Sequence, residues 1–310
     1  MKIMFMGTPE ISATCLLALV RAGLDVAAVV TGEDKPRGRG KVMTPTAVRA
    51  LAEQHGIPVL TPKTLRSDDF LRELESYSPE LIVVVAYGKI LPSAVLEYPK
   101  YGCINLHVSL LPKYRGAAPM QRAVMEGERE TGVTVMHMAE GLDTGDIISQ
   151  LSFPIGDTDT FETVHDTSAE LGSELLVKTI RNIESGAAVR APQDNSLATY
   201  AKKVEREDCR VDFELPASRL DCIIRGVTPI PGAFAYLNDK MLKLFNARPV
   251  SGTGLPGEVI ALDERGEGSF TVACGEGALR VSGVIPEGRG RMTAGDFIRG
   301  RKIKMGDILK

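Results

Sequence analysis

A continuous apolar run from Leu81 to Ala86 constrains the fold of this chain more than any other feature of its sequence. A strand that is apolar at every position fits only where both of its faces are buried. Such strands lie at the centre of parallel sheets that carry helices on both sides. The run therefore predicts an α/β fold built around a parallel sheet.

Strand and helix patterns alternate along residues 1–185, and this alternation predicts a doubly wound, mostly parallel sheet with helices on both faces. From residue 210 onward the pattern changes to short strands separated by turn residues, which predicts a small β-barrel. Between these regions lies a polar stretch with Gly and Pro, typical of a linker. We therefore divide the chain into a catalytic domain over residues 1–188, a linker over 189–209 and a C-terminal domain over 210–310.

The composition excludes several classes of protein. No stretch approaches the ~20 apolar residues of a membrane span, and the first apolar run is too short for a signal peptide, so we expect a cytoplasmic protein. The five cysteines are dispersed, which argues against a disulfide framework or a zinc site, and we expect no metal. Cys103 could be a nucleophile, but a free cysteine is more often a small buried apolar residue.

Two polar segments follow predicted strands, where an open α/β sheet binds its ligands. Asn105 and His107 are two positions apart, so on an extended chain their side chains point the same way. Asp143 lies between Gly141 and Gly145, which allow positive φ angles and the close approach of a ligand. An amide, an imidazole and a carboxylate can together stabilise an oxyanion and move a proton. Asn105, His107 and Asp143 are therefore the predicted catalytic residues.

Two neighbouring residues are alternatives for these roles. Asp146 competes with Asp143 as the carboxylate, although it lies nearer the next strand and could instead brace the loop. His137 ends its strand, and it could be a second catalytic imidazole or part of the wall of a pocket. The sequence leaves both alternatives open.

The segment from Lys35 to Lys41 carries four positive charges, at Lys35, Arg37, Arg39 and Lys41, on a backbone of Gly and Pro. We interpret it as an exposed loop that contacts phosphates, because Lys and Arg neutralise a nucleic-acid backbone without a rigid scaffold. The alternative is a solvated loop without a partner. The formal net charge of the whole chain is −3, so the molecule as a whole is not a basic nucleic-acid binder.

Taken together, these motifs resemble those of the folate-dependent formyltransferases. The resemblance rests on Asn105-Leu106-His107 followed by Ser109-Leu110-Leu111-Pro112, and on Gly141-Leu142-Asp143-Thr144-Gly145. Three further tracts are similar to those members of the family that act on methionyl-tRNA. These tracts are Gly7-Thr8-Pro9, Val83 to Gly88 and Tyr114 to Pro119.

The resemblance implies a Rossmann-like formyltransferase domain followed by an OB-like domain that contacts tRNA. It implies transfer of a formyl group from 10-formyltetrahydrofolate to the α-amine of initiator methionyl-tRNA. Separately, we expect the protein to act as a monomer. Asn105, His107 and Asp143 would be catalytic. Ser109, Leu110, Leu111 and Pro112 would line the folate site, and Lys35, Arg37, Arg39 and Lys41 would contact the tRNA.

Three other functions remain as alternatives. A related enzyme could formylate a small amine, such as a nucleotide sugar or glycinamide ribonucleotide, but such an enzyme would not need the basic segment. A non-catalytic RNA-binding protein would not need Asn105, His107 and Asp143 together. A dinucleotide-dependent dehydrogenase is disfavoured because the first turn contains only Gly7 where the dinucleotide fingerprint has three glycines.

Overall fold

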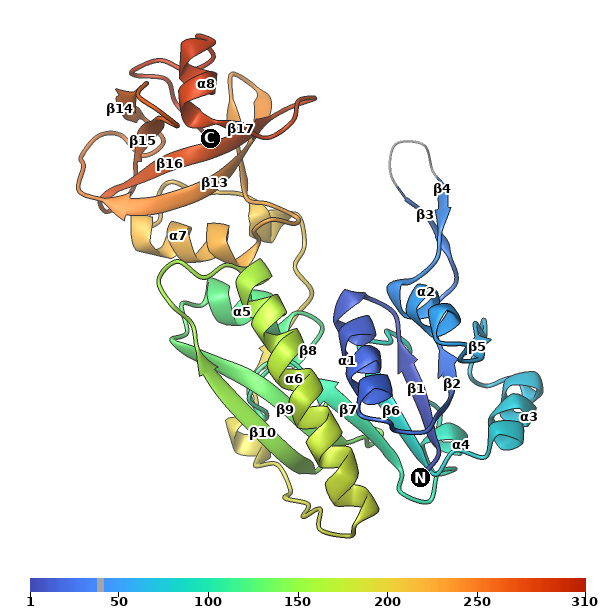
Figure 1. Ribbon diagram of the computed structural model, residues 1–310. Helices are drawn as coiled ribbons and strands as arrows, with labels where there is room; N and C mark the ends of the chain where they lie inside the picture. The colour runs from blue at the N-terminus through green and yellow to red at the C-terminus, as the bar shows by residue number, and fades with distance from the viewer. Residues whose placement is uncertain (38–41) are drawn as a thin grey trace. The chain divides into compact units, whose positions relative to one another are not determined.

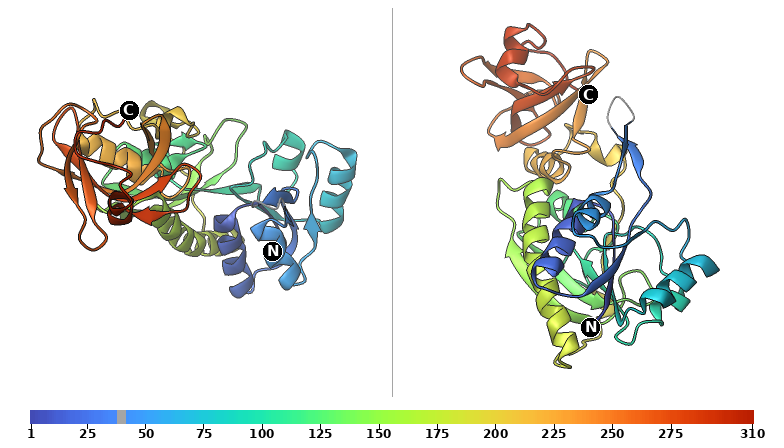
Figure 2. Two further views of the ribbon diagram at one scale, coloured as in Figure 1. Left: turned by 90° about the horizontal axis from the view of Figure 1, so that it is seen from above. Right: turned by 45° about the vertical axis from the view of Figure 1, so that its right-hand side comes forward.

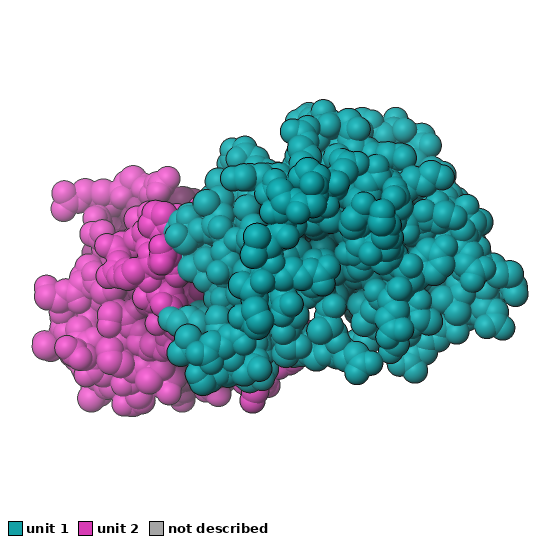
Figure 3. All heavy atoms as spheres, turned by 90° about the horizontal axis from the view of Figure 1, so that it is seen from below, with its two compact units in different colours: residues 1–116, 131–153, 165–200 teal, residues 117–130, 154–164, 201–310 magenta. Residues whose placement is uncertain are grey.

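The computed structural model describes residues 1–37 and 42–310, and these residues form two compact units (Figure 3). The first unit extends past residue 188, the domain boundary predicted from the sequence. In the described residues, no helix has both the length and the apolar character needed to cross a membrane. The first unit consists of Met1–Gly116, Thr131–Phe153 and His165–Tyr200, and the second of Ala117–Glu130, Pro154–Val164 and Ala201–Lys310.

A seven-stranded sheet forms the centre of the first unit, in the order β10-β9-β7-β6-β1-β2-β5. The strands from β7 to β5 are parallel, whereas β9 runs antiparallel to β7. The apolar run forms β6, which is buried at every position, so the prediction of a doubly wound, mostly parallel sheet is confirmed. The strands are β1 (Ile3–Gly7), β2 (Val26–Val30), β5 (Val59–Leu60), β6 (Leu81–Val85), β7 (Cys103–His107), β9 (Glu130–His137) and β10 (Ile147–Pro154).

Helices cover both faces of this sheet (Figures 1 and 2). One face packs against α1 (Glu10–Arg21), α2 (Ala47–Gln54) and α6 (Phe161–Glu184), and the other against α3 (Asp68–Tyr77) and α4 (Ser93–Leu96). Along β7, Ile104 and Leu106 belong to the core beneath α1 and α6, while Cys103 belongs to the core beneath α3 and α4. Because side chains alternate along a strand, Asn105 and His107 lie on the face of Cys103.

The direction in which the chain winds reverses between β1 and β6. From β1 the chain proceeds to β2 and β5 on one side, and from β6 to β7 on the other. Ligands of doubly wound sheets bind at the carboxyl ends of the strands next to such a reversal. The loops after these two strands meet there, since Thr8 Oγ1 lies 3.5 Å from Tyr87 O. The topology therefore directs a ligand toward the edge of the sheet where β7 ends in Asn105 and His107.

The described part of the basic segment forms a strand. Residues Lys35–Arg37 form β3, which pairs antiparallel with β4 (Val42–Thr44). The two strands make a hairpin that stands out from the sheet beyond α2 (Figure 1). Thr46 begins α2 by accepting a hydrogen bond of 3.0 Å from Arg49 N. Two of the four predicted RNA contacts, Arg39 and Lys41, lie outside the described residues.

The second unit contains a six-stranded antiparallel sheet in the order β12-β13-β16-β15-β14, with β17 paired to β16. Its strands are β12 (Phe234–Leu237), β13 (Lys240–Val250), β14 (Val259–Asp263), β15 (Ser269–Ala273), β16 (Ala278–Pro286) and β17 (Met292–Thr293). Its helices are α5 (Pro119–Met125), α7 (Ala217–Gly226) and α8 (Ala294–Arg299), with the short helical turn η2 (Glu207–Cys209).

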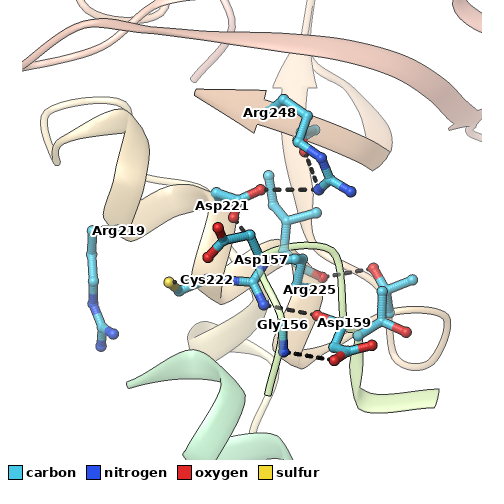
Figure 4. A network of polar contacts seen from close by, with 12 residues as sticks. Gly156, Asp157, Asp159, Arg219, Asp221, Cys222, Arg225 and Arg248 are labelled. Atoms are coloured by element: carbon cyan, nitrogen blue, oxygen red, sulfur yellow. Dashed lines mark hydrogen bonds and ion pairs between the residues drawn. The ribbon is translucent and has the colours of Figure 1, made fainter. Parts of the chain in front are cut away.

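Helix α7 carries a buried ionic network (Figure 4). The Asp221 carboxylate accepts a hydrogen bond of 2.7 Å from Arg225 Nε, one helical turn later, and lies 3.4 Å from Arg248 Nη1 on β13. Arg225 also donates to Asp159 O at 2.8 Å. Asp221 and Arg225 are both buried. Burying an unpaired guanidinium is energetically costly, and the Asp221 carboxylate offsets this cost by supplying the opposite charge.

Candidate active site

Strand β7 presents Asn105 and His107 at its carboxyl end, on the same face of the sheet as predicted. Pairing with both neighbouring strands fixes this register: Val84 of β6 pairs with Asn105, and Thr134 of β9 pairs with His107. His107 is 6 % exposed and Asn105 is half-buried. A buried imidazole next to a half-buried amide can act on an atom that approaches from this edge.

Both ring nitrogens of His107 face oxygen atoms. Nε2 lies 3.0 Å from Tyr114 O, and since a carbonyl oxygen only accepts hydrogen bonds, Nε2 must carry a hydrogen. Nδ1 lies 3.7 Å from Asp143 Oδ2. The structure thus brings the predicted imidazole and carboxylate together across two polar segments that are distant in the sequence. The 3.7 Å between Nδ1 and Asp143 Oδ2 is too long for a hydrogen bond, so the carboxylate acts on the ring as a nearby negative charge.

Asp143 is held in an unusual backbone conformation. Its φ angle is +52°, in the left-handed region that Asp visits more readily than most residues. Its Oδ2 accepts a hydrogen bond of 2.8 Å from Gly116 N, and this bond turns the carboxylate toward His107. The side chain is 14 % exposed, so it can still be reached from solvent.

The glycine at the end of this loop serves a different purpose from the one expected. The sequence predicts that the flanking glycines allow positive φ, but the positive φ lies on Asp143 itself. A Cβ atom on Gly145 would come within 1.6 Å of His137 O. Gly145 is therefore required by the close approach of two backbone segments.

The segment Ser109 to Pro112 lies beside the site, but several of its polar groups are already hydrogen-bonded within the protein. The buried Ser109 hydroxyl donates to Lys113 O at 2.7 Å. Thr134 Oγ1 donates to Ser109 O at 2.6 Å and accepts from Leu111 N at 3.2 Å. Leu111 is buried, whereas Leu110 and Pro112 are half-buried. The expectation that these four residues line a folate site therefore rests mainly on Leu110 and Pro112.

His137 and Asp146 lie away from the pair formed by His107 and Asp143. His137 is paired with Ile104 across the strands and so faces the opposite side of the sheet from Asn105. Its backbone N donates to Asp146 O at 2.9 Å. Burial, together with the positive charge of Arg190, lowers the pKa of His137 to about 4, although Asp146 opposes the shift. His137 is a neutral buried residue on the far face and does not form a wall of this site.

We expect His137 to make folding stability depend on pH. Its pKa is about 4 in the folded protein and 6.5 when exposed, so between these values the unfolded chain binds the proton more readily. Stability should therefore be complete above pH 6.5 and fall by about 3 kcal/mol toward pH 4. Urea unfolding at several pH values should show this loss in the wild type and a smaller one in His137→Gln. A matched change of the exposed His55 to Gln should leave the wild-type dependence intact, and equal slopes in all three proteins would contradict the prediction.

The alternative nucleophile Cys103 is unsuited to that role. Its thiol lies 3.6 Å from Val95 O and 3.7 Å from Leu96 O, within the core beneath α4. Burial raises the pKa of the Cys103 thiol to about 12, and the reactive form of a cysteine is the thiolate. Cys103 is therefore a buried apolar residue. Across residues 1–37 and 42–310, no three His, Cys, Asp or Glu side chains gather as they would around a metal ion.

The site is completed by Arg115, from the Tyr114 to Pro119 tract, and by Gln193 and Thr199, which the sequence does not single out. Gln193 contacts the backbone of the Asp143 loop, Arg115 contacts Gln193, and Thr199 accepts a hydrogen bond of 2.8 Å from Tyr114 N. Strand β8 (Arg115–Gly116) pairs with β11 (Tyr200–Ala201), and the turn η1 (Asn195–Leu197) lies between Gln193 and that strand. The polar stretch predicted as a linker thus contributes contacts to the site.

An imidazole paired with a carboxylate at the carboxyl edge of a doubly wound sheet is the arrangement of an α/β enzyme. Two family models match the chain: formyl transferase over residues 1–180, and formyl transferase, C-terminal domain, over residues 203–302. The chain belongs to the formyl transferase family.

Among its relatives, the chain is 45% identical over 309 residues to the methionyl-tRNA formyltransferase of Citrifermentans bemidjiense, covering 100% of this chain and 96% of that protein. It is 47% identical over 314 residues to the methionyl-tRNA formyltransferase of Halalkalibacterium halodurans, with 100% and 98% covered. The structure of HypX from Aquifex aeolicus in complex with tetrahydrofolic acid shares the fold. Its TM-score is 0.67 at 21% identity, over 99% of this chain and 50% of that one.

Proposed function

We propose that the protein transfers the formyl group of 10-formyltetrahydrofolate to the α-amine of initiator methionyl-tRNA. The observation that carries the proposal is the full-length similarity to two methionyl-tRNA formyltransferases. The contact between His107 and Asp143 at the carboxyl edge of the sheet supports it, because formyl transfer needs an oxyanion stabilised and a proton moved.

In the proposed reaction the neutral amine attacks the formyl carbon, and the carbonyl oxygen becomes an oxyanion. Asn105 would donate an amide N–H to this oxygen. His107 would donate from Nδ1, since its Nε2–H already binds Tyr114 O. One such donor is typically worth ~2.7–4 kcal/mol of transition-state stabilisation. The Asp143 carboxylate, 3.7 Å away, would stabilise the positive charge on the ring.

Asp143 is also the group placed to receive the proton that the attacking amine loses. When the intermediate collapses, the bond between the formyl carbon and the folate nitrogen breaks, and that nitrogen takes a proton from His107 Nδ1. The proton on Asp143 can then return to the ring. This sequence conserves protons and requires no covalent intermediate on the enzyme.

The folate would lie against the loops that close this edge of the sheet. Leu110 and Pro112 offer half-buried apolar surface on one side. The loop after β6 offers more, because Ile90 is 88 % exposed while its neighbour Leu91 is buried. Ala86 and Gly88 have positive φ angles in that loop, which shapes the backbone around a flat ring. An exposed isoleucine beside the site suits the aromatic face of a pterin.

The tRNA would contact the hairpin of β3 and β4 and a cationic surface in the second unit. Lys35 and Arg37 lie on β3, and Lys35 is exposed. In the second unit, a cavity of about 720 Å³ is lined by Lys240, Arg289, Arg301 and Lys302. Lysine and arginine side chains bind phosphates and release counterions, so such contacts strengthen binding at low salt.

A formylation assay tests the proposed function directly. The purified protein is incubated with 10-formyltetrahydrofolate and either methionyl-initiator-tRNA, free methionine, glycinamide ribonucleotide or an amino sugar nucleotide. Mass spectrometry should detect a mass gain of one formyl group on the methionyl-tRNA and not on the small amines. Preferential formylation of a small amine would contradict the proposed substrate.

We expect the positive charges of the basic segment to govern the use of tRNA. Changing Arg37, Arg39 and Lys41 together to Gln should raise the KM for tRNA about 10- to 100-fold at 0.15 M salt and leave kcat nearly unchanged. The dependence of log KM on log salt should become shallower, by ~0.7–0.9 for each phosphate that the hairpin no longer neutralises.

The matched control removes the same charge elsewhere. Arg72, Arg129 and Arg265 are exposed, and each pairs with a nearby carboxylate. Changing these three to Gln should leave the salt dependence of the wild type. If the control set weakened tRNA use as much as the hairpin set, the effect would come from net charge and the proposed contact would be refuted.

A further inference from the structure

The loop that carries Asp143 is held in place by one side chain from outside it. Gln193 Nε2 donates to Asp143 O at 2.8 Å and to Gly145 O at 2.7 Å. Both acceptors are backbone carbonyls of the loop that holds the left-handed Asp143. A single amide group therefore fixes the backbone immediately on either side of Thr144.

The orientation of the Gln193 amide is set by its other partner. Arg115 donates to Gln193 Oε1 from Nε at 3.2 Å and from Nη2 at 2.7 Å. A guanidinium group has only donors, so the amide oxygen must face Arg115 and the amide nitrogen must face the loop. The partners of Gln193 therefore determine which end of its amide is the oxygen and which is the nitrogen.

Arg115 is itself held firmly. It is 2 % exposed, its backbone N donates to Thr199 O at 2.8 Å, and its Nη2 also donates to Asn195 Oδ1 at 2.8 Å. Its neighbour Gly116 donates its backbone N–H to Asp143 Oδ2. Strand β8 thus binds the Asp143 carboxylate directly and supports the Asp143 backbone through Gln193.

From these contacts we infer that Gln193 is a positioning residue, which acts through Asp143 to keep its carboxylate facing His107. This inference rests on the proposed function. A left-handed, non-glycine residue persists only where its surroundings enforce it. Without the two hydrogen bonds from Gln193, the loop can relax and Asp143 Oδ2 moves from its place near Nδ1. Small displacements of a catalytic group are sufficient to slow a reaction strongly.

Two substitutions separate the role of the donor from that of the side-chain volume. Gln193→Ala removes both hydrogen bonds. Gln193→Glu keeps the size and can still accept from Arg115, but it presents oxygen to two carbonyl oxygens. We expect both to lower kcat about 10- to 100-fold, with the KM for either substrate changed by less than about threefold. Wild-type kcat in Gln193→Glu would overturn the inference, because the donated hydrogen bonds would then be dispensable.

Combining these changes with Asp143→Asn tests whether Gln193 acts through Asp143. If it does, adding Gln193→Ala to the Asp143 variant should cost less than about twofold in kcat, whereas independent effects would multiply. A multiplied loss would overturn the inference. Gln54→Ala is the matched control, since Gln54 is an exposed glutamine at the end of α2, and it should retain wild-type kcat.

Hydrogen exchange needs no substrate, so it tests the role of Gln193 separately from the proposed formyl transfer. Hydrogen exchange of peptides covering residues 139–146 should quicken in Gln193→Ala and Gln193→Glu, while exchange in β1 and β6 stays as in the wild type. Unchanged exchange in 139–146 would overturn the inference even in a fully active enzyme. A wild-type protein that formylates no methionyl-tRNA would count against the proposed function and leave the exchange result intact.

Discussion

Replacing Asp143 with Asn should lower kcat for formyl transfer about 1000-fold, with little change in the KM of either substrate. The new amide can still accept the hydrogen bond from Gly116 N, so its oxygen stays where Oδ2 is now. The oxygen near His107 Nδ1 would then belong to a neutral amide, and the NH₂ group would take the place of Oδ1. A neutral amide can neither stabilise a positive charge on the ring nor receive the proton that the attacking amine loses.

Asp146→Asn is the matched control, because this carboxylate lies three residues further along the same segment. Its backbone supports His137 on the other face of the sheet, so the variant should keep kcat within about threefold of the wild type. Single-turnover rates with methionyl-tRNA and saturating formyl donor measure both variants. If Asp143→Asn kept more than a tenth of the wild-type rate, or if Asp146→Asn were equally impaired, Asp143 would lose its assigned role.

Removing the Asp221 carboxylate should strongly lower the stability of the protein. Asp221→Ala leaves the buried Arg225 guanidinium with Asp159 O and Cys222 Sγ as its remaining hydrogen-bond partners in Figure 4. Stranding one charge of a buried pair typically costs about 3–5 kcal/mol in the free energy of unfolding. Urea unfolding of the full chain, followed by circular dichroism, should show this loss.

Two further variants test the reason for that loss. Asp221→Leu combined with Arg225→Met removes both charges and should recover most of the lost stability, because apolar residues can replace a buried pair at little cost. Asp157→Ala breaks the exposed pair with Arg129 and should change stability by less than about 1 kcal/mol. A double variant no more stable than Asp221→Ala would show that packing, and not the stranded charge, causes the effect.

The parts of the fold and site that the sequence predicts are those with a local signature. The apolar run of β6 identifies a strand buried on both faces, and the two-residue spacing of Asn105 and His107 places them together. Asp143 is different, because β9 runs antiparallel to β7 and ends at His137 beside Ile104, so the loop after β9 has to carry Asp143 back to His107. The antiparallel direction of β9 has no such signature, because it depends on how the chain returns after α5.

Other features depend on partners that are far away in the sequence. Gln193 contacts backbone atoms 50 residues earlier and an arginine 78 residues earlier, and a lone glutamine in a polar stretch gives no sign of either. Helix α7 escapes prediction for a different reason. Its buried Leu220, Ile223 and Ile224 have helical spacing, but they lie at the start of a region dominated by strands.

The position of Gln193 limits how this chain can be recombined with its relatives. The polypeptide completes its sheet and α6 by Glu184, yet the residues that brace the reactive loop follow at 193–199. A chimaera joined at residue 188 would take the loop that carries Asp143 from one parent and the supporting residues 193–199 from the other. A junction beyond Ala201 would keep both from a single parent, so exchange of C-terminal modules among formyl transferases should succeed there and fail at the apparent domain border.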